Sequence, residues 1–514
     1  MTRTITPAEL RSHWIANREI ALVDVREEGP FAAGHPLFAL TVPVSEVEIG
    51  IPPLVPRLTT PVVVYDDGEG YAARAVPRIE ALGYTDVRIL EGGLAAYAKE
   101  GEVYIDVNVP SKAFGELVES IRHTPSLPAE EVKRIIDTEP NAVVLDARRF
   151  EEFTTMSIPR GQSVPGGELV YRIHDIAPSP DTLVVVNCAG RTRSIIGTQS
   201  LINAGIPNRV VALRNGTIGW TLAGLSVETK ATAKGGAPST DGREIARTNA
   251  RRWADHVGVP VVDAATVNTW QAQGDRTLYL LDVRSPDEHA AGHPPGFVSA
   301  PGGQLVQATD EWLGVRGARV VLYDDDGVRA RMAASWLHQM GWQVAVLDDA
   351  DGLNLPSAHR PWSWGGDTVD TVEGAVIADL ARHAAYRKGH IPGAWFVSGP
   401  ELARDIARLP GDGPIILTSP DGRVAAANLD VARSATSRPV SVLSGGTNAW
   451  QGELEVKGRE ASNPIDAYKR PYEGTDNARE KMQAYIDWEL GLVAQLANDG
   501  VSRFHVVRAI NDQR

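Results

Sequence analysis

The stretch VVVNCAGRTRSIIGTQSLINAG, residues 184–205, joins an apolar run to a polar loop and then to a helical pattern. The run VVVN at 184–187 is β-branched and apolar on both faces, which is typical of a buried parallel strand. From Ser194 onwards the sequence favours a helix. The loop between them starts at Cys188, the only cysteine among the 514 residues. The stretch therefore predicts a strand, a short loop with a thiol at its start, and a helix.

The same unit occurs three more times along the chain. The other apolar runs are VVVY at 62–65, VVLY at 320–323 and IILT at 415–418. The residues that begin the four loops are Asp66, Cys188, Asp324 and Ser419. Upstream, a second apolar run ends each time in an acidic residue, at Asp24, Asp146, Asp282 and Asp379. The interval from that acid to the loop is 42 residues in the first three copies and 40 in the fourth. Such regular spacing indicates an internal repeat.

Strands that alternate with helical stretches predict an α/β fold, in which each repeat is a parallel sheet flanked by helices. We expect four such domains and a C-terminal helical extension, at residues 1–105, 125–228, 257–360, 371–455 and 456–514. In the extension, apolar side chains at helical spacing predict an amphipathic helix over 478–497. Sheets of this kind bind ligands beyond the carboxyl ends of their strands, where the four loops begin.

Polar segments rich in Gly, Pro and Thr separate the repeats and are expected to be linkers, at 106–124, 229–256 and 361–370. The clearest is TKATAKGGAPSTDGRE at 229–244. It predicts that the chain divides there into two halves, with the first repeat packed on the second and the third on the fourth.

Composition limits the classes of function. The formal net charge of −14 argues against nucleic acid or an anionic membrane as a partner. No apolar run approaches the ~18 residues of a spanning helix, and the N-terminus does not resemble a secretory signal, so we expect a cytoplasmic protein. One cysteine rules out an intramolecular disulfide.

The loop around Cys188 has the features of a reactive thiol. The N-terminus of a helix and the charges of Arg191 and Arg193 favour a thiolate, and Gly190 lets backbone N–H groups turn toward one centre. We therefore expect the pKa of Cys188 to be lowered and the thiolate to act as a nucleophile. The alternative is that Cys188 is a small buried apolar residue, as free cysteines often are.

The pattern strand–CAGRTRS–helix, with LDAR 42 residues earlier and RNGTIGW downstream, resembles the rhodanese superfamily. GHIPGAWFV at 389–397 is similar to a second signature of that family, whereas the second repeat has Ser157 where the histidine of that signature would be. The resemblance covers about residues 1–455. It implies a sulfurtransferase in which Cys188 carries a persulfide. It further implies a set of substrate-binding residues, which are Ala189, Gly190, Arg191, Thr192, Arg193 and Ser194, with Asp146 and Arg148 as structural residues near the site.

The other three repeats lack a thiol and are expected to be inactive. Asp66 and Asp324 are interpreted as helix caps, and Ser419 has no evident base beside it in the sequence. His289 and His293 are four residues apart, but no third ligand completes a metal site. We therefore expect neither a metal nor a cofactor.

Two loop arginines favour a small anionic sulfur donor, such as thiosulfate or glutathione persulfide. The acceptor would be cyanide or a thiol, on a small molecule or a protein. Two alternatives remain. The repeats could form a sulfur carrier or a scaffold that binds partners, in which case the thiol would be buried and inert. The chain could also resemble the related phosphatases and arsenate reductases, although their loop is one residue longer than the one from Cys188 to Arg193.

Overall fold

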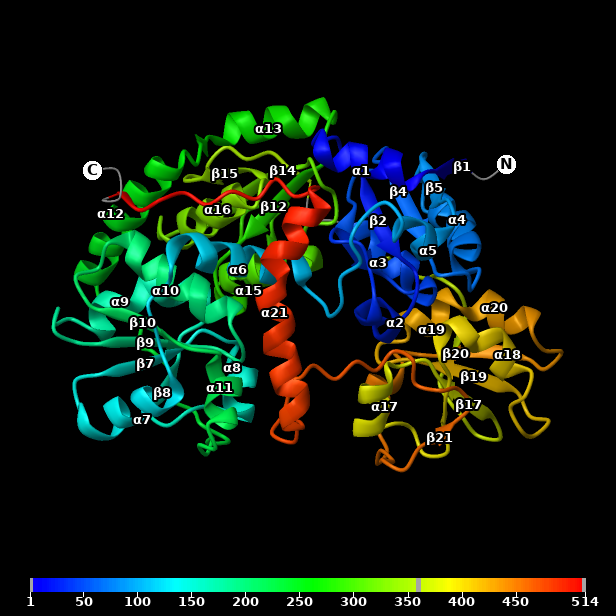
Figure 1. Ribbon diagram of the computed structural model, residues 1–514. Helices are drawn as coiled ribbons and strands as arrows, with labels where there is room; N and C mark the ends of the chain where they lie inside the picture. The colour runs from blue at the N-terminus through cyan, green and yellow to red at the C-terminus, as the bar shows by residue number, and fades with distance from the viewer. Residues whose placement is uncertain (1–2, 357–361, 511–514) are drawn as a thin grey trace. The chain divides into compact units, whose positions relative to one another are not determined.

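The computed structural model describes residues 3–356 and 362–510. It contains four parallel sheets whose strands follow the same order, β1-β5-β4-β2-β3 in the first repeat and the equivalent order in the others (Figure 1). The fourth sheet has one additional strand, β21, at its edge. Helices flank each sheet, so the predicted α/β fold with four repeats is confirmed.

Equivalent residues occupy equivalent positions in the four sheets. The strand that ends in the acidic residue pairs in parallel with the strand that precedes the loop, and the facing pairs are Asp24–Tyr65, Asp146–Asn187, Asp282–Tyr323 and Asp379–Thr418. Each loop begins one residue later. The four loops therefore leave their sheets at the same edge, beyond the carboxyl ends of the central strands.

One compact unit contains the fourth repeat and the first repeat apart from residues 11–19, within residues 3–10, 20–107 and 362–469. The first repeat consists of β1 (Arg3–Ile5), α1 (Pro7–Ile15), β2 (Ala21–Asp24), α2 (Glu28–Ala33), β3 (Ala39–Thr41), α3 (Val47–Leu54), β4 (Val62–Tyr65), α4 (Tyr71–Ala81), β5 (Val87–Leu90) and α5 (Gly93–Tyr97). The fourth consists of β16 (Thr368–Val369), β17 (Val376–Asp379), α17 (His383–Lys388), β18 (Trp395–Phe396), α18 (Leu402–Ile406), β19 (Ile415–Thr418), α19 (Arg423–Ala427), α20 (Leu429–Ser434), β20 (Val440–Leu443) and β21 (Arg459–Glu460).

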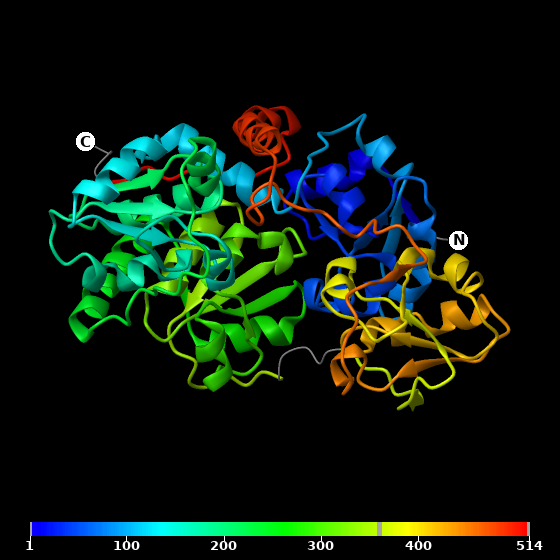
Figure 2. The ribbon, with the colours of Figure 1, turned by 90° about the horizontal axis from the view of Figure 1, so that it is seen from below.

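The other unit contains the second and third repeats, within residues 11–19, 108–356 and 470–510 (Figure 2). The second repeat consists of β6 (Ser126–Leu127), α7 (Ala129–Thr138), β7 (Val143–Asp146), α8 (Phe150–Thr155), β8 (Gly161–Ser163), α9 (Leu169–Ile176), β9 (Val184–Asn187), α10 (Thr192–Ala204), β10 (Val210–Leu213) and α11 (Gly216–Leu222). The third consists of β11 (Val261–Val262), α13 (Ala264–Gln273), β12 (Leu278–Asp282), α14 (Pro286–Ala291), β13 (Val298–Ser299), α15 (Gly302–Gln307), β14 (Arg319–Tyr323), α16 (Arg329–Gln339) and β15 (Gln343–Leu347).

The expected division of the chain into halves is wrong. Most of the supposed linker at 229–256 belongs to helix α12 (Thr240–Val257), which packs on α9 of the second repeat and α16 of the third. Its buried face contains Ala246, Ala250, Trp253 and Val257, and the indole N–H of Trp253 donates to the hydroxyl of Ser335 at 3.1 Å. The segment therefore joins the second and third repeats, because its small buried residues provide a packing face on each side.

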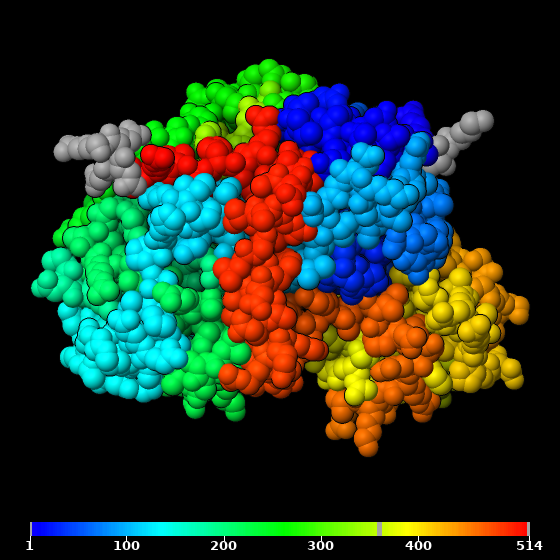
Figure 3. Space-filling model, in the orientation of Figure 1, coloured from blue at the N-terminus to red at the C-terminus, as the bar shows by residue number. Residues whose placement is uncertain are grey.

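Two further helices complete the second unit. The expected linker at 106–124 is largely helix α6 (Val109–Arg122), whose buried Ala113, Phe114 and Val118 pack between α10 and helix α21 (Arg479–Asp499). The amphipathic helix predicted at 478–497 is thus confirmed as α21, which lies along the surface with one face exposed (Figure 3).

The sheet of the fourth repeat extends beyond the expected range 371–455. It includes β16, which lies in the expected linker at 361–370, and β21 in the expected extension. Two-residue strands carry too little pattern to be found from the sequence. The expected boundary at residues 360 and 361 lies outside the described residues. No helix in the described part of the chain is both long and apolar enough to cross a membrane.

The second and third repeats meet through a pair of glycine turns. A Cβ atom at Gly167 would lie 2.6 Å from the backbone nitrogen of Gly303, and a Cβ at Gly303 would lie 2.6 Å from that of Gly167. Both turns follow the third strand of their sheets, as the equivalent PGG sequences at 165–167 and 301–303 suggest. Backbones this close leave no room for a side chain.

Candidate active site

Cys188 lies directly after β9 and before the first turn of α10. Its side chain is buried, and its Sγ atom lies 3.4 Å from the hydroxyl of Ser194. The carbonyl oxygen of Cys188 accepts a hydrogen bond from the backbone N–H of Thr217 at 2.8 Å. Gly216 has φ +56°, and a Cβ atom there would lie 2.5 Å from the carbonyl oxygens of Cys188 and Gly190. The repeated turn before α11 therefore supports the loop from one side and requires a glycine to do so.

In every repeat, the side chain of the first loop residue forms a hydrogen bond with the backbone N–H of the residue six positions later. The N–H of Ala72 donates to the carboxylate of Asp66 at 2.8 Å. The N–H of Ala330 donates to the carboxylate of Asp324 at 2.9 Å. In the fourth repeat the equivalent N–H donates to the hydroxyl of Ser419 at 3.3 Å. The expected capping role of the two aspartates is confirmed. In the second repeat the equivalent N–H, that of Ser194, hydrogen bonds with the sulfur of Cys188.

The pKa of the thiol differs from the sequence expectation. Burial raises the pKa of Cys188, and the charge of Arg193 and the hydrogen bonds from Ser194 only partly oppose this effect. The expectation of a lowered pKa is therefore wrong for the protein without a bound donor. The cause is desolvation, which penalises the charged form of any buried acid.

Both loop arginines are already paired with carboxylates. Arg193 donates two hydrogen bonds to Glu152 of α8, at 2.7 and 2.8 Å. Arg191 donates two to Glu116 of α6, at 2.7 and 2.9 Å, and one to the side chain of Asn215 at 2.9 Å. The sequence alone indicates only two positive charges in the loop. The partners could not be found, because Glu152 is one of several acids in its segment and Glu116 lies in an expected linker.

Asp146 and Arg148 hold the sheet edge beneath the loop. The guanidinium of Arg148 lies 2.7 Å from Asp146, and both side chains are buried. The side-chain amide of Asn187 also donates to Asp146, at 3.1 Å. Equivalent pairs occur in the first and third repeats, Arg26 with Asp24 and Arg284 with Asp282. Since the pair also occurs where the loop has no cysteine, it stabilises the repeat itself.

A cavity with about 290 Å³ of empty space, part of it open to solvent, lies over Cys188. The predicted residues that line it are Cys188, Ala189, Gly190, Arg191, Thr192 and Arg193. Ser194 is not part of this lining, but its hydroxyl accepts a hydrogen bond from the sulfur. The rest of the lining comes from outside the second repeat, namely Lys112, Gln307, Tyr472, Tyr485 and Glu489. The sequence offered no signal for these five, because they lie in α6, α15 and the region around α21.

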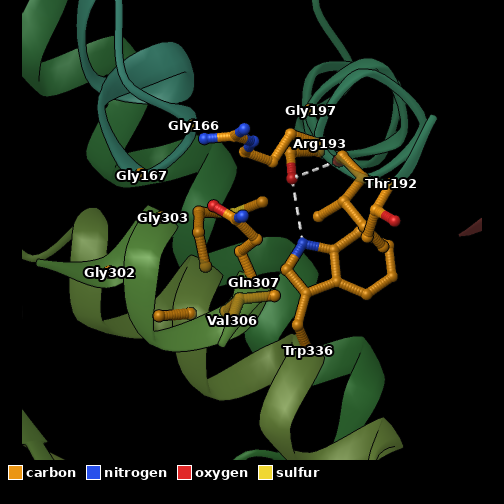
Figure 4. A pocket seen from close by; sticks show the side chains of 14 residues that line it. Gly166, Gly167, Thr192, Arg193, Gly197, Gly302, Gly303, Val306, Gln307 and Trp336 are labelled. Atoms are coloured by element: carbon orange, nitrogen blue, oxygen red, sulfur yellow. Dashed lines mark hydrogen bonds between the residues drawn. The ribbon is translucent and has the colours of Figure 1, made fainter. Parts of the chain in front are cut away.

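A second cavity, with about 460 Å³ of empty space, adjoins the first between the second and third repeats. Figure 4 shows Gly166 and Gly167 on one side of it and Gly302 and Gly303 on the other. Trp336 closes one end and donates its indole N–H to Ser200 at 2.9 Å. Thr192, Arg193 and Gln307 line both cavities. The third repeat therefore forms part of the surroundings of the loop that begins at Cys188.

Comparison with known proteins places this geometry in a family. The family model for the rhodanese-like domain matches four times, at residues 6–100, 128–223, 263–350 and 367–453. A solved structure of a thiosulfate sulfurtransferase from Pseudomonas aeruginosa matches with a TM-score of 0.95 and 52% sequence identity, over 98% of this chain and 100% of that one.

Two curated proteins are similar over a shorter region. The thiosulfate sulfurtransferase of Azotobacter vinelandii is 24% identical over 230 residues, which cover 37% of this chain and 83% of that protein. A second thiosulfate sulfurtransferase from Pseudomonas aeruginosa is 25% identical over 229 residues, with the same coverage. The predicted resemblance is confirmed, and the chain belongs to the rhodanese-like family as a sulfurtransferase with four rhodanese-like domains.

Proposed function

We propose that the chain moves a sulfane sulfur from an anionic donor, such as thiosulfate or glutathione persulfide, to a thiol or cyanide through a persulfide on Cys188. The supporting observation is the position of the sulfur. At the end of β9, Sγ donates to the hydroxyl of Ser194 at 3.4 Å, accepts the backbone N–H of Ser194 and lines a cavity that reaches solvent. In the silent repeats the same position holds an oxygen that accepts the equivalent N–H. The loop is therefore suited to an anionic sulfur.

The charges of the cavity favour an anionic donor. The guanidinium groups of Arg191 and Arg193 are each balanced by a carboxylate, and the ammonium of Lys112 also lines the cavity. A dianion such as thiosulfate gains charge-assisted hydrogen bonds from such a group. We assign donor binding to Lys112 together with the loop residues Ala189 to Ser194.

The reaction proceeds in two halves. The thiolate of Cys188 attacks the sulfane sulfur of thiosulfate, the S–S bond of the donor breaks, and sulfite leaves with the electron pair. The acceptor then attacks the outer sulfur of the persulfide, and the Cys188 thiolate leaves. Arg193 and the N–H of Ser194 stabilise the thiolate at both stages, since both lower the pKa of the thiol.

We assign catalysis to the second repeat, expected at 125–228, and consider the other three repeats inactive, because Asp66, Asp324 and Ser419 cannot form a persulfide. The test is mass spectrometry of the protein after incubation with thiosulfate. The peptide that contains Cys188 should gain one sulfur atom, and Cys188→Ser should abolish transfer to cyanide. Full transfer by Cys188→Ser would exclude the proposed mechanism.

A further inference from the structure

Helix α21 carries a carboxyl group on its buried face. Glu489 is fully buried, one helical turn after Tyr485, one turn before Leu492 and two turns before Leu496. These neighbours pack against the second unit, so a carboxyl group among them is costly unless a partner compensates for its lost water. Glu489 also lines the cavity over Cys188. We therefore consider what this buried carboxyl group does in the cavity.

The two oxygens of Glu489 have different surroundings. Oε1 accepts a hydrogen bond from the hydroxyl of Tyr485 at 2.7 Å. Oε2 is buried and has no hydrogen-bond partner within the described residues. It lies next to the active loop, since a Cβ atom built on Gly190 would be 3.4 Å from it. Oε2 is thus the oxygen available to a molecule that reacts at Cys188.

The charged and titratable groups that act on Glu489 come from α6, from the loop after β9 and from α21 itself. Helix α6 provides Glu116 and Lys112, the loop provides Arg191, and α21 itself provides Tyr485, while α11 has no titratable side chain. Burial, and after it the charge of Glu116, raises the pKa of Glu489 to about 8, and Lys112, Tyr485 and Arg191 oppose this. Glu489 is therefore protonated at neutral pH and close to its titration point, as a proton-transfer group should be.

The ammonium of Lys112 lies among three aromatic rings. Its ammonium lies 5.1 Å from the ring centre of Tyr472, 5.3 Å from that of Tyr485 and 5.6 Å from that of Trp488. This cage fixes a positive charge beside the cavity while leaving Oε2 of Glu489 unpaired. The arrangement separates the group that attracts an anion from the group that can move a proton.

We propose that Glu489 is the proton-transfer group of the second half-reaction, in which it moves the proton of an acceptor thiol to the outer sulfur of the Cys188 persulfide. This inference rests on the proposed persulfide mechanism. An anionic outer sulfur repels an incoming thiolate, whereas a protonated outer sulfur accepts its attack. A carboxyl group that both donates and accepts a proton removes this obstacle.

The steps balance without a further reactant. The carboxyl of Glu489 gives its proton to the persulfide anion, which forms Cys188–S–SH and a carboxylate. The carboxylate takes the proton of the acceptor thiol. The resulting thiolate attacks the outer sulfur, the S–S bond to Cys188 breaks, and the Cys188 thiolate leaves with the electron pair. The products are the acceptor persulfide, the Cys188 thiolate and a protonated Glu489.

The test measures the two half-reactions separately in the full-length protein. Glu489→Gln keeps the size of the side chain and an oxygen that accepts the Tyr485 hydroxyl, but it cannot transfer a proton. We expect loading with thiosulfate, followed by mass spectrometry, to stay within about twofold of the wild type. The single-turnover discharge to a small thiol should fall about 100-fold, the lower end of the usual effect of general acid–base catalysis. Its pH profile should lose the transition near pH 8. Glu480→Gln, an exposed change on the same helix, should leave both half-reactions unchanged.

A second variant keeps the carboxyl group in place. Tyr485→Phe removes the hydroxyl that lowers the pKa of Glu489, so the transition in the discharge profile should move to higher pH by roughly one unit. Unchanged thiol discharge in Glu489→Gln, or an unmoved transition in Tyr485→Phe, would overturn the role of Glu489 while the persulfide mechanism stands. Failure of the wild type to load sulfur on Cys188 would instead overturn the proposed function.

Discussion

Arg193 and Glu152 form a two-bond ion pair beside the thiol of Cys188, and Arg329 and Glu288 form the same pair in the third repeat. The distances are 2.7 and 2.8 Å in the first pair and 2.7 and 2.9 Å in the second. The loop of the third repeat begins with Asp324 and carries no thiol. Because the pair persists without the thiol, it ties the loop to the helix that follows the second strand. The same ion pair also keeps the charge of Arg193 near Cys188, where it lowers the pKa of the thiol.

This relationship predicts how Glu152→Gln changes stability with pH. Burial alone would raise the pKa of Glu152, but Arg193 outweighs it and the pKa falls to about 2. A carboxyl with a lowered pKa stabilises the fold above its unfolded value of about 4.3, and this stabilisation is lost as the pH falls through about 2. Glu152→Gln should therefore lower the free energy of unfolding by about 1–3 kcal/mol at pH 7.

Chemical denaturation at several pH values measures this difference. The difference in the free energy of unfolding between wild type and Glu152→Gln should decrease below about pH 4 and disappear near pH 2. Glu151→Gln changes the exposed acid beside it on α8 and should have little effect. A gap that is independent of pH would show that the loss comes from packing and not from the ion pair.

The reactivity of Cys188 provides a second prediction. Burial raises the pKa of the thiol, while the charge of Arg193 and the hydrogen bonds of Ser194 lower it. Replacing either residue by alanine should raise the pKa further, so the rate of alkylation by iodoacetamide should rise at higher pH than in the wild type. Arg214→Ala, an exposed arginine on the neighbouring turn, should not shift the profile. Alkylation profiles that coincide for Arg193→Ala, Ser194→Ala and wild type would remove both residues from thiolate stabilisation.

The sequence was sufficient to locate the thiol but not its surroundings. The constant interval between Asp146 and Cys188, shared by the other repeats, predicted two neighbouring strands and the loop at their ends. The helix α12 was missed because its buried face relies on Ala246, Ala250 and one Trp253, which give little apolar signal among many charged residues. Small residues pack closely without appearing hydrophobic in a sequence.

The cavity lining could not be predicted for a different reason. Lys112 and Glu489 reach Cys188 from segments about 75 residues before it and 300 residues after it. No pattern within a repeat indicates that a helix from outside will cover its loop. Glu489 even contradicts the local pattern, since it is a carboxyl group on an otherwise largely apolar face. Such a departure from local rules is often associated with a functional site.

The glycine turns between the second and third repeats give a third prediction. Gly167→Ala would place its Cβ atom 2.6 Å from the backbone nitrogen of Gly303, so the two turns must move apart. We expect a loss of about 1–3 kcal/mol in the free energy of unfolding, as for other overpacked sites. Gly236→Ala is the matched control, because a Cβ atom there meets nothing within 4 Å. Equal stability of the two variants would mean that the turns are not in close contact.

The grouping of the second repeat with the third leads to the last prediction, which concerns the fragment 1–232. This fragment ends before α12 and lacks the third and fourth repeats and α21. In the unit of the second and third repeats, it loses α12, which packs on α9 and α10, and α21, which packs on α6. In the other unit, it loses the fourth repeat. We expect it to be aggregation-prone, because the faces that α12, α16 and α21 cover are apolar.

A point variant makes the same test in the full-length chain. Trp253→Ala removes a fully buried indole of α12 and its hydrogen bond to Ser335, which should cost about 3–5 kcal/mol. Arg251→Ala, an exposed change on the same helix, should cost little. Thermal unfolding compares the stability of the two variants, and an assay of sulfur transfer compares their activity. If Trp253→Ala were as stable as Arg251→Ala, and the fragment 1–232 were soluble and fully active, α12 would be a linker after all. The pairing of the second repeat with the third would then have no part in holding the active loop.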